Sequence, residues 1–144
     1  MWLDQRGSEV LGRNECLRLL AVHAGGVGRV GLVGNTGGVV IEPVIYRVLD
    51  GDVLIQVGPG SLLDAARRPS AVAFETDHLD LGGRQAWSVL VRGLATVIDD
   101  RRRAAGARPP AARPLVPVPG DTLVRIRTDI LSGRRFALRT PASS

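Results

Sequence analysis

Three stretches of strand length, separated by two tight turns, occupy residues 29–57 and constrain the fold more than any other feature of the sequence. Apolar side chains recur through 29–33, 39–47 and 53–57 in the pattern typical of β-strands. The two connections, Asn35-Thr36-Gly37-Gly38 and Leu49-Asp50-Gly51-Asp52, contain residues that tolerate the positive φ of hairpin turns. Because consecutive hairpins place their strands side by side, we expect an antiparallel meander here.

The rest of the chain adds more strand patterns, which are expected at 71–76, 86–98, 122–127 and 134–139. The last two form either a closing strand pair or a strand followed by a tail. Since no regular alternation of strand and helix occurs, we expect a mainly β fold, a small antiparallel barrel of six or seven strands with two short helices. It forms one domain over 1–144, with its core at about 15–139, a lead at 1–13 and a disordered tail at 140–144.

Two short helices are expected beside the barrel. The first runs over 15–24 with Asn14 as its N-cap, and the second runs over 61–68 with Ser61 as its cap. Within the strands, Pro43 lacks an N–H, so its position is an edge, a bulge or a place where a ligand replaces the missing donor. Gly93, inside the long strand, predicts a bend or bulge.

The basic residues exclude several kinds of chemistry. All 19 are arginine, and without lysine there is no Schiff base to pyridoxal phosphate and no phosphate-loop lysine. A phosphate group would therefore be held by arginine, backbone N–H groups and hydroxyls. The net charge of +5 suits nucleic acid, but the arginines are scattered. The densest group, at 101–103, precedes a Pro-rich stretch at 104–120 that is expected to be a solvated connection. With few aromatic side chains for base stacking, we expect a small-molecule ligand and no nucleic-acid partner.

The sequence also favours the cytoplasm. No apolar run approaches the ~18 residues of a membrane span, and the first residues do not resemble a secretion signal. The single cysteine, Cys16, cannot form an internal disulfide, which agrees with a reducing compartment.

Two glycine motifs are candidates for phosphate binding. Gly26-Val27-Gly28-Arg29-Val30-Gly31 matches the dinucleotide fingerprint, but it follows a helix and opens a strand, the reverse of the required context. Gly58-Pro59-Gly60-Ser61 does lie between a strand and a helix. It is either an anion site, made by the Ser61 hydroxyl and nearby N–H groups with Arg67 or Arg68, or a capped helix start without a ligand.

The two histidines receive no assigned role. His23 on the helix 15–24 is interpreted as a packed residue, because no second ligand stands at metal-binding spacing. His78 lies in a polar loop expected at 77–85, beside Asp77 and Asp80, where a proton relay, a weak metal cluster and a solvated loop are the alternatives. We predict no metal site, and no nucleophile elbow or other pattern identifies a catalytic residue.

Several short motifs, in order, resemble the pyridoxamine 5′-phosphate oxidase-like family, the FMN-binding split barrels. They are "ECLRLLA", "VGRVGLV", the segment from "VVIEPVIYRV" to "AVAFETD", and "WSVLVRGLATVI", which together span about residues 15–99. The resemblance implies a six-stranded antiparallel split β-barrel with short helices, which forms a homodimer with a flavin in each of two clefts between the subunits. It also implies an oxidoreductase whose chemistry resides in the cofactor, although a non-enzymatic binding module is the alternative.

The resemblance further implies which residues contact the cofactor. Val44, Ile45 and Tyr46 are expected beside the flavin ring, while Gln56, Val57, Gly58, Ser61 and Leu62 lie near the ribityl chain or phosphate. Leu62 stands where many members have a basic residue, so Arg67, Arg47 or a partner's arginine would have to compensate. The cofactor is expected to be FMN, with a deazaflavin, haem or none as alternatives.

Overall fold

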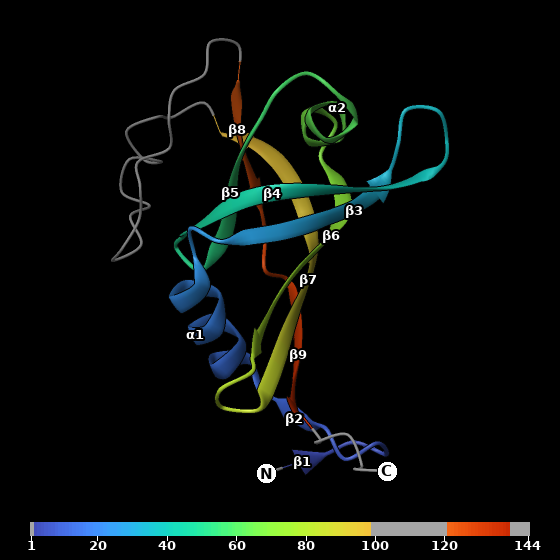
Figure 1. Ribbon diagram of the computed structural model, residues 1–144. Coiled ribbons are helices and arrows are strands. Elements are labelled where there is room, and N and C mark those ends of the chain that lie inside the picture. Colours follow the sequence, from blue (N-terminus) through green and yellow to red (C-terminus); the bar gives the residue numbers. More distant parts are fainter. Residues whose placement is uncertain (1, 99–120, 139–144) are drawn as a thin grey trace.

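The computed structural model describes residues 2–98 and 121–138, which form two helices and nine strands (Figure 1). The helices are α1 (Arg13–His23) and α2 (Ser61–Arg67). The strands are β1 (Trp2–Leu3), β2 (Glu9–Leu11), β3 (Val27–Val33), β4 (Val39–Leu49), β5 (Asp52–Val57), β6 (Ser70–Asp80), β7 (Gln85–Ile98), β8 (Thr122–Ile126) and β9 (Ile130–Ala137). The Pro-rich stretch 104–120 and the tail expected at 140–144 lie outside the described residues. No described helix is long and apolar enough to cross a membrane.

Six of the strands close into an antiparallel barrel, as the sequence predicts. The strands follow the order β6, β3, β4, β5, β8 and β7, and β7 pairs in turn with β6. The meander of β3, β4 and β5 is confirmed, and the turn between β4 and β5 has Asp50 at φ 50° and Gly51 at φ 81°. Two positive φ values at the centre of a two-residue turn match the twist of a hairpin. Phe74 and Tyr46 lie at the centre of the core, with no exposed surface.

The end of the chain differs from the expected strand pair. β8 and β9 do not pair with each other, because each pairs with a different half of β7: β9 along Gln85 to Arg92, and β8 along Ala95 to Ile98. β9 also begins earlier than predicted, at Ile130. Gly93 lies between the part of β7 that pairs with β9 and the part that pairs with β8. Its pairing with β6 shows no bulge, so the predicted bulge is wrong.

Both predicted helix caps are wrong. α1 begins after Gly12, whose extended backbone makes it the N-cap, and Asn14 lies inside the first turn. α2 begins after Gly60, whose φ of 155° favours glycine, and the cap has no side-chain hydrogen bond. The N-terminal lead is also more ordered than expected, since β1 and β2 extend the sheet beside β9 and Leu11 joins the core.

Asp52 fixes the β4–β5 turn to β8 and leads to a stability prediction. Its carboxylate, whose side chain is 14% exposed, accepts hydrogen bonds from Arg125 Nε at 2.7 Å and from the Thr128 N–H at 2.9 Å. Burial alone would raise the pKa of Asp52, but these hydrogen bonds outweigh it and hold the pKa below its usual value.

We expect Asp52→Asn to lower the free energy of unfolding by about 2 kcal/mol, because an amide replaces a carboxylate in charge-assisted hydrogen bonds. Urea denaturation at neutral pH measures this loss. This difference in stability should become smaller as pH falls below 3.8, the ordinary pKa of Asp52, because the carboxylate then becomes protonated in the unfolded chain. The control is Asp129→Asn, whose ion pair with Arg127 is exposed and 3.5 Å long. Equal losses in the two variants would contradict the prediction.

Candidate functional site

The most distinctive feature of the barrel is an open edge on β4. β3 pairs with β4 from Val39 to Ile45, whereas β5 pairs with β4 only from Tyr46 onward. No strand among the described residues occupies the other edge of 39–45. Pro43 lies in this segment, and its pairing with β3 runs without a bulge, so of the three alternatives the edge position is confirmed.

The three residues expected beside a flavin ring point in different directions. Tyr46 is fully buried, packs against the Phe74 ring at 5.0 Å, and donates its hydroxyl to the Leu20 carbonyl at 2.7 Å. Burial raises its pKa, so it is a core residue without acid–base function at neutral pH. Ile45 is 52% exposed and Val44 is half-buried. Only Val44 and Ile45 remain available to a ligand.

The turn expected to bind the phosphate is held by hydrogen bonds from the β3–β4 connection. The Ser61 hydroxyl accepts the Asn35 N–H at 3.0 Å, and Asn35 Nδ2 donates to the Asp64 carboxylate at 2.7 Å. At the other side of the turn, Gln56 Nε2 donates to the Asp121 carboxylate at 3.1 Å. A Cβ on Gly58 would lie 3.2 Å from that same carboxylate. Two carboxylates, those of Asp64 and Asp121, thus lie at this turn among the described residues.

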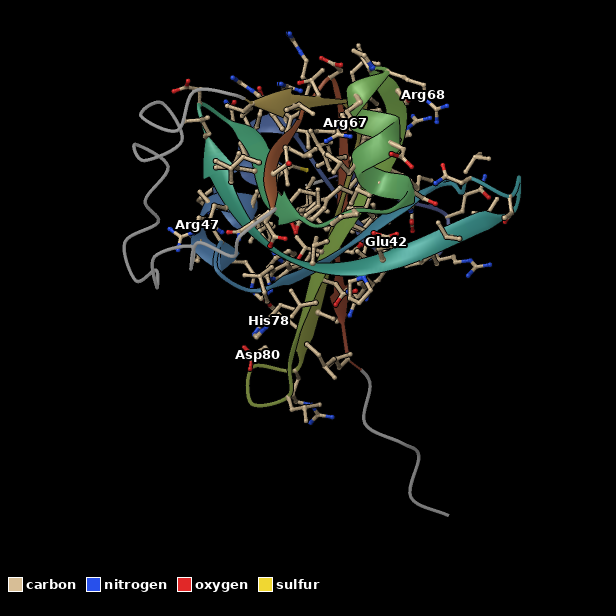
Figure 2. All side chains as sticks on the ribbon, turned by 90° about the horizontal axis from the view of Figure 1, so that it is seen from above. Glu42, Arg47, Arg67, Arg68, His78 and Asp80 are labelled. Atoms are coloured by element: carbon tan, nitrogen blue, oxygen red, sulfur yellow. The ribbon has the colours of Figure 1, made fainter. Side chains whose placement is uncertain are left out.

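Of the other residues expected near the phosphate, two have buried side chains and Arg67 lies at the far end of α2 from the turn. Leu62 is 1% exposed and Val57 is 7% exposed, so both side chains belong to the core. Arg67 ends α2, about 9 Å along the helix axis from Ser61. Figure 2 shows Arg67 and Arg68 beside α2 and Arg47 apart from both. Arg47 is buried.

One outer face of the barrel is apolar across β9, β7, β6, β3 and β4. The pairing register aligns Ile41, Gly31, Ala73, Arg92 and Ile130 in a single row across these strands. Neighbouring rows contribute further large apolar side chains. The exposed ones are Val27, Val33, Val39, Ile41, Ile45, Leu90, Leu94 and Ile130. Contiguous exposed apolar surface of this kind marks an interaction site.

The middle of this face is hollowed into a groove. The groove has a volume of about 680 Å³, and its lining includes Gly31, Ala71, Ala73, Leu94 and Ile130. Small side chains at the centre and larger ones around it make the hollow. Arg92 lines it as well, and no described residue forms an ion pair with that guanidinium.

An ion-pair cluster borders the same face. Arg29 lies 3.3 Å from the Glu75 carboxylate and 3.6 Å from that of Asp77. Burial, and then the neighbouring Asp77, raise the pKa of Glu75 to about 7 from its ordinary 4.5. The folded protein thus holds this proton more tightly than the unfolded chain, so the free energy of unfolding falls as pH rises through this window.

Glu75→Gln should remove this pH dependence. The Glu75 side chain is 32% exposed, so solvent screening limits the effect to about 1 kcal/mol. Thermal unfolding of both proteins at pH ~5 and pH ~8 measures it: the variant should gain stability relative to the natural chain at the higher pH. A variant that keeps the same pH slope would show that Glu75 does not titrate in this window.

The structure brings together two histidines that the sequence left apart. The His23 and His78 rings lie 5.6 Å apart, and Trp87 lies edge-on to His23 at 5.4 Å. The expected polar loop at 77–85 is wrong, because β6 continues to Asp80 and the connection is confined to 81–84. His78 therefore lies in a strand, and Asp77, on the opposite side of the strand, pairs with Arg29.

Comparison with known proteins now identifies the family. The sequence model described as pyridoxamine 5′-phosphate oxidase matches residues 12–135. The chain belongs to the pyridoxamine 5′-phosphate oxidase family. It is 36% identical over 140 residues to the uncharacterized protein Rv0080 of Mycobacterium tuberculosis. The aligned part covers 91% of this chain and 88% of that protein.

Solved structures of this family agree with the barrel described here. A protein of Mycobacterium smegmatis described as FAD-binding is 30% identical, with a TM-score of 0.68 over 89% of this chain and 99% of that one. A putative pyridoxamine 5′-phosphate oxidase of Corynebacterium glutamicum is 27% identical, with a TM-score of 0.71 over 96% of this chain and all of that one. The resemblance found in the sequence and the split-barrel fold it implied are both confirmed.

Several residues of the site were not anticipated. Asn35 and Asp64 contact the turn through tertiary hydrogen bonds, and Asp121 reaches it from the start of β8. No local pattern in the sequence signals these contacts, because each joins segments that are distant along the chain. The proximity of His23 to His78 is of the same kind.

Proposed function

We propose that this chain is a cytoplasmic oxidoreductase subunit that binds a flavin, FMN in the first instance, between two copies of itself and acts on a small molecule. The open edge of β4 carries the proposal, because it leaves backbone groups and the side chains of Val44 and Ile45 available in a barrel that is otherwise closed. The relative described as FAD-binding, at 30% identity, supports a flavin. The bound flavin would supply the hydride or electron transfer, and the protein would bind and orient it.

A second copy of the chain is the partner that best fits the apolar face. Unpaired strand edges and contiguous apolar surface are liabilities in a monomer. Both occur together here, on β4 and its neighbours. The face also carries both signs of charge, with Glu75 and Asp77 near one end and Arg92 in the groove. A two-fold contact can therefore bring opposite charges together across the axis.

The ring and the phosphate of FMN fit this chain unequally. Apolar Val44 and Ile45 suit a flavin ring, whereas Asp64 and Asp121 at the turn repel a phosphate. Ser61 keeps a hydroxyl hydrogen to donate, since its oxygen serves as the acceptor from Asn35. A phosphate held here would need an arginine from the partner subunit.

The experiment that tests the proposal is an absorption spectrum of the purified protein, followed by titration with FMN, FAD, riboflavin, a deazaflavin and haem. We expect the visible bands of an oxidised flavin, or saturable binding of a flavin near micromolar concentration. A protein that binds none of the flavins saturably would contradict the proposal.

The carboxylates at the turn favour a second candidate, a non-enzymatic binding module that has lost its phosphate contacts. Asp121→Asn distinguishes the two. If the phosphate lies at this turn, removal of one carboxylate should strengthen FMN binding by roughly tenfold, or about 1.4 kcal/mol, and leave riboflavin binding unchanged. Asp50→Asn, at an exposed position of the β4–β5 turn, is the matched control. A protein that binds FMN no better than riboflavin, before and after the change, would support the second candidate.

A further inference from the structure

His23 and His78 form a pair of imidazoles at the barrel end that carries the β6–β7 connection. His23 is the last residue of α1, and His78 lies near the end of β6. Their ring centroids are 5.6 Å apart, with an angle of 53° between the planes. Trp87, opposite His78 in the β6–β7 pairing, lies 5.4 Å from the His23 ring and 6.3 Å from the His78 ring. Tyr46 bounds the pair at 6.5 Å from His23.

In the part of the chain that the structure describes, neither imidazole ring makes a side-chain hydrogen bond or an ion pair. The Nε2 edge of His23 lies over Gly26, and a Cβ on Gly26 would approach Nε2 to 3.0 Å. The absence of a side chain at Gly26 thus leaves room beside this nitrogen. His23 is half-buried and His78 is exposed, so the pair can be reached from solvent.

The spacing of the rings matches two ligands of one ion. A metal bound to a ring nitrogen at about 2.0–2.1 Å lies roughly 3.2 Å from the ring centroid, so two imidazoles on one ion have centroids roughly 5–6 Å apart. The observed 5.6 Å falls in this range. Imidazole nitrogen is a preferred ligand of zinc, copper and nickel.

The surroundings keep the pair ready to bind a cation. Burial, and then the neighbouring His78, lower the pKa of His23, while Asp77 opposes the shift. The lowered pKa of His23 favours neutral imidazole, which is the form that binds metals. Figure 2 shows Asp80 close to His78 on β6, where its negative charge favours a cation.

We propose that His23 and His78 together bind one divalent transition-metal ion, with Cu²⁺ bound more tightly than Zn²⁺. Over residues 2–98 and 121–138 no group of three or more His, Cys, Asp or Glu side chains could hold an ion. Water would therefore complete the coordination, which makes the ion exchangeable rather than a structural element. The proposal is independent of the flavin.

Titration of the purified protein with Cu²⁺ tests the site, because a paramagnetic ion bound here should quench the fluorescence of nearby Trp87. We expect one ion per chain, bound in the micromolar range, with Zn²⁺ competing. Trp87→Phe should abolish the fluorescence response while equilibrium dialysis still finds the ion bound.

The variants His23→Gln and His78→Gln should each weaken binding by at least about tenfold. Val22→Gln, at an exposed position of the same helix turn, should leave it unchanged. Circular dichroism and thermal unfolding establish that each variant is folded. Where His23→Gln does not fold, His78→Gln decides the question alone, since that side chain is exposed. Unchanged binding in a folded histidine variant, or copper uptake that does not saturate, would overturn the proposal.

Discussion

Replacement of Gly93 by alanine is expected to cost about 3 kcal/mol or more in the free energy of unfolding. A Cβ at this position would lie 1.8 Å from the Arg127 carbonyl oxygen and 2.8 Å from its carbon. Both are backbone atoms, so no side chain can rotate away. Arg127 is itself held by a hydrogen bond from its N–H to the Leu94 carbonyl at 3.0 Å.

The loss is large because Gly93 lies where β8 and β9 replace each other along β7. Accommodation of a methyl group would separate these strands and open the barrel. A cost of this size is a substantial share of the ~5–15 kcal/mol that stabilises a typical domain. Urea denaturation, with circular dichroism to detect an unfolded variant, measures it.

Gly38→Ala is the matched control, because nothing lies within 4 Å of the Cβ that it adds and the backbone there has no positive φ. It should change the stability by less than about 0.5 kcal/mol. If Gly93→Ala were as stable as Gly38→Ala, the close contact between Gly93 and the Arg127 carbonyl would be wrong.

The second large effect is expected from Ile41→Arg on the apolar face. Ile41 is 71% exposed in the single chain, so the change should leave the folded monomer intact. A charge buried in the proposed interface between two copies should cost about 2–4 kcal/mol of association. Self-association would then weaken by roughly 30- to 700-fold, and flavin binding would weaken with it.

Val22→Arg provides the control, since Val22 is also 71% exposed but lies on α1. Sedimentation equilibrium of the two variants and the natural chain measures the association. Equal dimer stability in all three proteins would exclude the apolar face as the interface. A monomeric natural chain would exclude the dimer itself.

The sequence predicted those structural features that depend on residues close together along the chain. The β4–β5 turn was predictable because Asp50 and Gly51 tolerate positive φ, and the meander follows from such turns. The dinucleotide-like glycines were correctly interpreted as part of a strand, since β3 begins at Val27 and no helix follows it directly. The edge position of Pro43 followed from its missing N–H.

Features that depend on distant residues were not predictable from one sequence. The placement of β8 and β9 along β7 is decided by pairings between remote segments. The burial of Tyr46 and Leu62 depends on which side of the barrel wall each side chain faces. Alternation showed that Val44 and Tyr46 oppose Ile45, but it did not show which side faces the core.

The candidate site divides in the same way. The resemblance to the family, which the match over 12–135 confirms, singled out the strand at Val44–Tyr46 and the turn before Ser61, and the structure contains a strand and a turn at these positions. The electrostatic character of the turn was not foreseen, because Asp121 enters it only through the closure of the barrel by β8. The roles of the individual residues toward a cofactor remain predictions.

The central claim is that a flavin is held between two copies of this chain, and sedimentation followed by visible flavin absorbance tests it most directly. With the protein saturated in FMN, we predict that the visible absorbance sediments with a species of twice the mass of one chain, at one flavin per chain. Flavin absorbance that sediments with a single chain, or that stays with the free cofactor, would contradict the account.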